Sequence, residues 1–128
     1  MTTKALANAE TALATLLAFL AEPVASERDR AGVIQAFEFT FEATWKLIKF
    51  VAEREGLPAE SPRRALIAGY KLGLLQDETL WLDMLRDRNL TSHVYHHQIA
   101  ERIFVAIQSR YAHALAEAVG RAHVTLAP

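Results

Sequence analysis

The segment from residue 26 to residue 55 constrains the fold of this chain more than any other feature. Its large apolar side chains return at three- and four-residue steps, among them Phe37, Phe41 and Trp45, while its charged residues lie mainly on the opposite side. Gly56 follows as a natural helix stop. Such a helix would be roughly 40 Å long at 1.5 Å per residue. That exceeds the width of a compact body of this size, so we expect a second copy of the chain to pack along it.

Helical spacing of apolar residues also covers most of the remaining chain. It predicts helices over residues 3–21, 61–73, 77–89 and 97–119, the second of these being short, with Gly120 ending the last one. No run alternates polar and apolar residues, and there is no Asn-Gly or Asp-Gly turn, so no strand is predicted. We therefore expect an all-α fold: a homodimeric, up-and-down bundle of four long helices and one short one, with residues 1–128 in one domain.

Composition excludes several classes of function. The absence of cysteine excludes disulfides, Cys-based zinc sites and thiol nucleophiles. Fourteen Lys and Arg residues face fifteen Asp and Glu residues, so any contact with RNA has to be local. The glycines are scattered, and no Gly-rich phosphate loop exists, so we expect this chain to bind no ATP and no cofactor by itself.

The N-terminal stretch is rich in Ala and Leu but carries Asn8 and Glu10, and its apolar residues recur at helical spacing. A signal peptide has a continuous apolar block instead. No apolar run approaches the roughly 20 residues of a membrane span. We expect a cytoplasmic protein without a membrane contact.

Residues 87–97 concentrate polar and titratable groups where the helical pattern lapses. On a regular helix Arg88 and His93 would point about 140° apart, but a break at residues 89–92 could bring them together. His93 could transfer a proton to or from a ribose hydroxyl, and Arg88 could hold a phosphate and the charge that builds on it. One histidine fills only one of the two proton-transfer roles, and a second His93 across a dimer could fill the other.

Structural roles are the alternative for these residues. Arg88 could pair with Asp83, Asp87 or a helix C-terminus, and His93 could cap or pack. The spacing of His93, His96 and His97 could also suit a metal, although no carboxylate stands at a recognisable motif position, so no metal site is predicted.

Two other groups of residues have similar alternatives. The aromatic stripe on residues 37–45 could stack on bases, but helical spacing favours a core or a dimer interface. Glu38 and Glu42 could act as acid and base, but are expected to be solvated. Arg63 and Arg64 begin a helix, where cations oppose the dipole, which hints at an anion or a partner.

Several blocks, in order, resemble HEPN-domain proteins, specifically the HepT-like toxins and the subgroup called nucleotidyltransferase substrate binding proteins. Most specific is the pattern Arg-x4-His-x-Tyr, and further matching blocks lie at residues 37–46, 61–63, 72–75 and 81–85. The resemblance covers most of the chain. It implies a homodimeric helical bundle with two copies of the motif facing each other across a cleft.

The resemblance also implies roles for single residues. Arg88 and His93 would carry metal-independent RNA cleavage, Asn89 would support them, and Tyr95 would be the residue that a minimal nucleotidyltransferase (MNT) partner modifies with AMP to silence the toxin. Positions 96 and 97 are commonly acidic in the family and are histidines here. Whether the chain is an enzyme stays open, since the resemblance equally implies a non-catalytic substrate-binding subunit of a two-component nucleotidyltransferase.

Overall fold

The computed structural model describes residues 3–93 and 96–128, and within these residues it contains helices and no strand. The all-α prediction is confirmed. The elements are α1 (Lys4–Ala21), α2 (Glu27–Arg54), α3 (Pro62–Lys71), α4 (Glu78–Leu90), the 3₁₀ turn η1 (Thr91–His93), α5 (His97–Ala106), the π-helical turn η2 (Ile107–Tyr111) and α6 (Ala112–Leu126).

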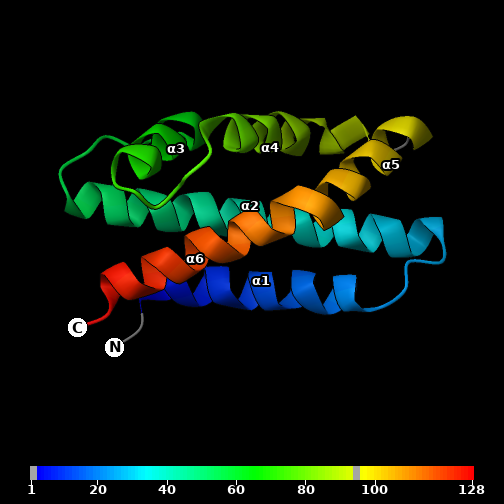
Figure 1. Ribbon diagram of the computed structural model, residues 1–128, viewed down its shortest axis with the longest axis horizontal. Coiled ribbons are helices and arrows are strands. Elements are labelled where there is room, and N and C mark those ends of the chain that lie inside the picture. Colours follow the sequence, from blue (N-terminus) through cyan, green and yellow to red (C-terminus); the bar gives the residue numbers. More distant parts are fainter. Residues whose placement is uncertain (1–2, 94–95) are drawn as a thin grey trace.

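Helix α2 is the axis of the bundle (Figure 1). Helix α1 runs back along one side of α2, and α3 and α4 lie along the other side (Figure 1). Helices α5 and α6 follow each other diagonally across α2, and α6 also packs on α1. The end of α4 and the start of α5 lie near the start of α2, whereas α3 lies near the end of α2 (Figure 1). The predicted up-and-down bundle is thus confirmed, with α3 as the short helix.

The ends of α2 follow from local chemistry. The Ser26 hydroxyl accepts the Asp29 amide N–H at 3.1 Å, and the Asp29 carboxylate accepts the Ala25 N–H at 2.9 Å. At the other end Gly56 adopts a φ of 78°, a left-handed conformation that costs glycine little. Between these ends α2 buries twelve residues, so it is held by core packing along its length.

The C-terminal helix corrects the prediction at Gly120. The helix does not stop there but continues to Leu126. Gly120 can stay helical because glycine only weakens a helix, and the next turn is held by packing, with Ala122 fully buried. The ring of His123 also lies 3.0 Å from the Glu10 carboxylate of α1, which ties this last turn to the bundle.

Helix α1 is, within the described residues, the one helix long and apolar enough by length and composition to span a membrane, with a mean hydropathy of 1.2 over 18 residues. This is weak evidence for a span, because core helices and N-terminal signal sequences pass the same test. In the bundle α1 packs on α2 and α6 and buries Leu6, Ala9 and Leu16. The Thr40 hydroxyl of α2 donates to the Ala12 carbonyl at 3.0 Å.

Candidate functional site

The end of α4 is where the regular helix gives way, as the sequence predicted. Arg88 lies in its last turn, and the chain then tightens into the 3₁₀ turn Thr91–His93. The Thr91 hydroxyl donates to the Arg88 carbonyl at 2.7 Å and accepts from Arg88 Nη1 at 3.3 Å. Thr91 therefore satisfies a carbonyl at the helix end and holds the guanidinium against the turn.

Arg88 pairs with a residue that the sequence did not indicate. Its Nη1 lies 3.7 Å from the Glu38 carboxylate of α2, and both side chains are 31% exposed. The alternative that Arg88 pairs with Asp83 or Asp87 is wrong, because both carboxylates are turned to other arginines. Glu38, which was expected to be solvated, is only part exposed and pairs with Arg88. No spacing rule links two residues on different helices, so this pair could be found only in three dimensions.

The guanidinium of Arg88 is incompletely satisfied. Its Nε is buried and has no hydrogen-bond acceptor among the described residues. A buried donor without a partner costs about 1–3 kcal/mol. Thr44 Oγ1 is the other such side-chain atom in this part of the chain. The described residues therefore leave the Arg88 guanidinium with one buried donor unpaired.

The other predicted site residues are placed only in part. Asn89 is exposed in the last turn of α4, and its carbonyl accepts the Ser92 hydroxyl at 3.4 Å. His93 ends the 3₁₀ turn, but its side chain lies outside the described residues. Tyr95 lies outside them entirely. The structure therefore brings Arg88, Asn89 and the backbone of His93 to one turn of the chain.

A buried acidic centre lies directly beside this site. The Asp87 side chain is fully buried and accepts two hydrogen bonds from Arg102, at 3.0 and 3.2 Å, and one from the Tyr111 hydroxyl at 2.5 Å. Arg86 Nε adds an ion pair at 3.5 Å. We call Asp87, Arg102 and Tyr111 the Asp87 network. It joins the end of α4 to α5 and to the π-helical turn η2.

The network shifts the pKa values of its members. Burial alone would raise the pKa of the Asp87 carboxyl, but the hydrogen bonds from Arg102 and Tyr111 outweigh it and hold that pKa below its ordinary value. Burial, and then the hydrogen bond to Asp87, raise the pKa of the Tyr111 hydroxyl. Asp87 is thus held charged and Tyr111 neutral.

The sequence carried one unused signal for this network. Ile103, Ile107, Tyr111 and Leu115 are each four residues apart, and all are at most 1% exposed. On a regular α-helix each such step drifts by roughly 40°, so the stripe would turn by roughly 120° from Ile103 to Leu115. The π-helical turn widens the helix at residues 107–111 and takes up this drift, which aims Tyr111 at Asp87.

The histidines after the site have structural contacts. His97 Nδ1 lies 3.1 Å from Arg30 Nη2 and 3.2 Å from the Glu27 carboxylate, and Arg30 also pairs with Glu101 at 2.8 Å. His96 takes the N-cap position of α5 without a side-chain capping bond. Across the described residues no three or more His, Asp or Glu side chains gather as metal ligands would.

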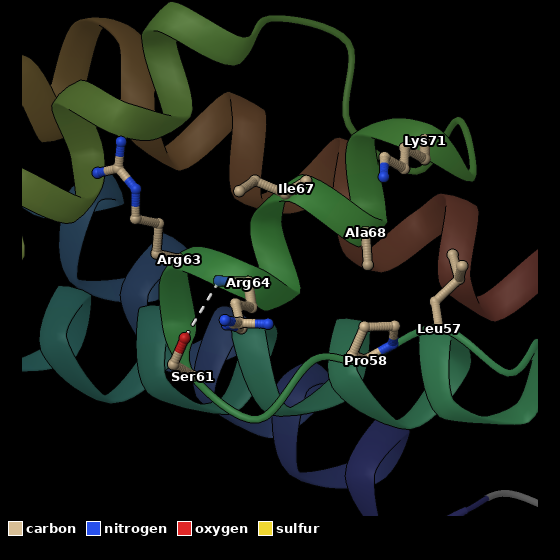
Figure 2. Close-up of a pocket in the computed structure, with 8 residues that line it drawn as sticks. All are labelled: Leu57, Pro58, Ser61, Arg63, Arg64, Ile67, Ala68 and Lys71. Carbon is tan, nitrogen blue, oxygen red and sulfur yellow. Dashed lines mark hydrogen bonds between the residues drawn. The ribbon is translucent and has the colours of Figure 1, made fainter.

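A separate pocket lies beside α3 (Figure 2), and α3 lies at the opposite end of the bundle from the end of α4 (Figure 1). It has a volume of about 420 Å³ and is lined by residues that include Leu57, Pro58, Ser61, Arg63, Arg64 and Lys71. Ser61 caps α3 by accepting the Arg64 N–H at 3.2 Å (Figure 2), and the Arg64 side chain pairs with Glu60 at 3.4 Å. The cations noted in the sequence thus border a pocket, but one remote from Arg88.

Known proteins share this fold. A solved structure from Thermus thermophilus is 39% identical, with a TM-score of 0.80, and the match covers 89% of this chain and 98% of that one. A second, HI0074 from Haemophilus influenzae, is described as having the fold of a substrate binding domain of a nucleotidyltransferase. It matches with a TM-score of 0.80 at 22% identity over 92% of this chain and 98% of that one, which shows the fold alone.

Sequence comparison agrees. A Haemophilus influenzae protein named "Probable ribonuclease HepT" is 28% identical over 82 residues, which cover 60% of this chain and 56% of that protein. The chain thus matches about half the length of this relative. The family described as "Nucleotidyltransferase substrate binding protein like" matches residues 4–122. The resemblance inferred from the sequence is confirmed, and the chain belongs to this family of proteins like nucleotidyltransferase substrate binding proteins.

Proposed function

We propose that this protein is the HEPN toxin of a pair with a minimal nucleotidyltransferase. In this proposal it is a cytoplasmic homodimer that cleaves RNA without a metal. Arg88, Asn89 and His93 form the site at the dimer interface, and nucleotidylation of Tyr95 silences it. The relative named as a ribonuclease supports this function by similarity.

The observation that carries the proposal is the state of the Arg88 guanidinium. It is held by Thr91 in the same 3₁₀ turn that contains His93, and the Arg88 side chain is 31% exposed. A phosphate is an anion that a guanidinium binds through charge-assisted hydrogen bonds. The part of Arg88 that is open to solvent is therefore suited to hold an RNA phosphate beside His93.

The test is cleavage of RNA by the purified protein in the presence of EDTA. We expect His93→Ala and Arg88→Ala to reduce the cleavage rate at least about 100-fold, the lower range for loss of a proton-transfer or charge-stabilising group. His113→Ala and Arg64→Ala are matched controls, since both residues are exposed and sit in i,i+4 pairs on other helices. Undiminished cleavage by His93→Ala would exclude its catalytic role.

A second function is favoured by a different observation. Glu38 already neutralises part of the Arg88 charge, which weakens an electrostatic hold on RNA. This favours the alternative in which the chain is a non-catalytic subunit that docks on a nucleotidyltransferase and presents a substrate to it. Both functions predict a stable complex with the transferase.

Mass analysis of the chain co-expressed with a nucleotidyltransferase encoded beside it tests the modification. We expect an AMP adduct on Tyr95 and its loss in Tyr95→Phe. Tyr70 is 47% exposed and gives the matched control Tyr70→Phe, whereas Tyr111 is buried and cannot be reached. RNA cleavage without any adduct would support the toxin without this mode of control, and an adduct without cleavage would support the subunit.

A further inference from the structure

We propose that Glu38 of α2 is the general base of the RNA cleavage site. This inference rests on the proposed ribonuclease function and names the group that takes the first proton in that reaction. One His93 supplies one of the two proton transfers, and a second copy across a dimer is one source of the other. Glu38 is a source within the same chain.

The geometry places Glu38 next to the group that would hold the phosphate. Its carboxylate lies 3.7 Å from Arg88 Nη1, and its side chain is 31% exposed, so a substrate can reach it. The backbone of Glu38 is held rigidly, because its neighbour Phe37 and the nearby Thr40 are fully buried. The single Thr40 hydroxyl proton is shared between the Ala12 carbonyl at 3.0 Å and the Ala36 carbonyl at 2.7 Å. A rigid, solvent-accessible carboxylate beside a phosphate-binding arginine suits proton abstraction from a ribose.

The other carboxylates near the end of α4 are paired with residues other than Arg88. Asp87 is fully buried and occupied by Arg102 and Tyr111. Asp83 is turned to Arg86 and Arg110. Among the described residues, Glu38 forms its ion pair with Arg88, and Arg88 forms its ion pair with Glu38.

The reaction balances without a co-reactant. Glu38 takes the proton from the 2′-hydroxyl, and the 2′-oxygen forms a bond to phosphorus. The bond from phosphorus to the 5′-oxygen breaks, and that oxygen takes a proton from the His93 imidazolium. The products are a 2′,3′-cyclic phosphate and a 5′-hydroxyl, and Arg88 neutralises the charge on the phosphate oxygens during the step.

The experiment measures RNA cleavage in EDTA across the pH range for the wild type, Glu38→Gln and Glu42→Gln. Glu42 is the matched control, because it lies one turn along α2 and contacts Trp45 and Lys46 instead of Arg88. We expect Glu38→Gln to lose about 100-fold or more in rate. We also expect it to lose the fall in rate on acidification, because glutamine has no proton to gain. Circular dichroism checks that each variant folds.

A sulfur-substituted substrate separates the two proton transfers. When the bridging 5′-oxygen of the cleaved linkage is replaced by sulfur, the leaving thiolate needs no proton. We expect this RNA to restore cleavage by His93→Ala and not by Glu38→Gln. Restoration of Glu38→Gln instead would show that Glu38 is not the base.

The outcomes distinguish this inference from the function on which it rests. If the wild type cleaves RNA and Glu38→Gln keeps its rate, or loses rate but keeps the acid limb, Glu38 is not the base and the ribonuclease stands. If the wild type cleaves no RNA, the ribonuclease function fails, and this inference fails with it.

Discussion

Asp87 and Arg88 are neighbours in sequence, but their side chains differ in burial and in how completely they are hydrogen-bonded. Asp87 is fully buried, and each of its oxygens accepts a hydrogen bond. Arg88 is part exposed, has one carboxylate 3.7 Å away, and keeps a buried Nε without an acceptor among the described residues. Complete hydrogen bonding is typical of a residue that stabilises the fold, whereas a buried donor without a partner is an exception in native proteins. The difference agrees with a structural role for Asp87 and with the functional role proposed for Arg88, and four predictions test it.

Removal of the Asp87 carboxylate should have the largest effect on stability. Asp87→Ala leaves the Tyr111 hydroxyl buried without an acceptor and takes the partner of Arg102 away, which should lower the free energy of unfolding by about 3 kcal/mol. Urea denaturation followed by circular dichroism measures this. Asp83→Ala is the control, since its ion pairs are more exposed and should cost under about 1 kcal/mol. Equal losses in the two variants would contradict a special role for Asp87.

Acid should weaken the same network. Because the pKa of Asp87 is lower in the folded chain than its ordinary value, the stability it contributes is present above the ordinary Asp range. That stability is lost as the pH falls through the lower, folded-state pKa. Denaturation of the wild type and Asp87→Asn at several pH values from neutral into the acid range measures it. The gap in stability between the two should shrink on acidification, and a constant gap would refute the prediction.

Loss of the Tyr111 hydroxyl should have a smaller effect. Tyr111→Phe keeps the ring, which stacks on Phe37 with centroids 5.7 Å apart, and removes only the hydrogen bond to Asp87. The expected loss is about 1–2 kcal/mol, since a bond to a charged acceptor is stronger than a neutral one. The melting temperature should therefore fall less than in Asp87→Ala. A larger fall would mean that Tyr111, and not Asp87, is the centre of the network.

Replacement of Arg88 should lower stability least. Arg88→Met breaks a pair that is about one-third exposed, which lowers stability slightly, and removes a buried donor without a partner, which raises it, so the unfolding free energy should fall by less than about 0.5 kcal/mol. Arg102→Met is the matched control and should cost more, since it removes two hydrogen bonds from Asp87. If Arg88→Met is as damaging as Arg102→Met, then Arg88 is a structural residue and the comparison fails.

Much of the fold could be predicted because its signals are local. The Ser26 cap, the stop at Gly56 and the apolar stripe of α2 depend on residues within a few turns of one another. The break after α4 was also predicted, since residues 89–92 favour the helix poorly. Gly120 misled the prediction, because packing of the last turn against α1 outweighs the weak helix preference of one glycine.

The candidate site, too, could be predicted from the sequence only in its local features. The sequence by itself determined that polar residues gather at 87–97, that the helix breaks there, and which family the blocks resemble. Only the tertiary structure decided that Glu38 meets Arg88 and that Asp87 is taken by Arg102 and Tyr111. The physical reason is distance along the chain. Caps and helix breaks act over a few residues, whereas ion pairs between helices depend on how those helices pack, which no local spacing encodes.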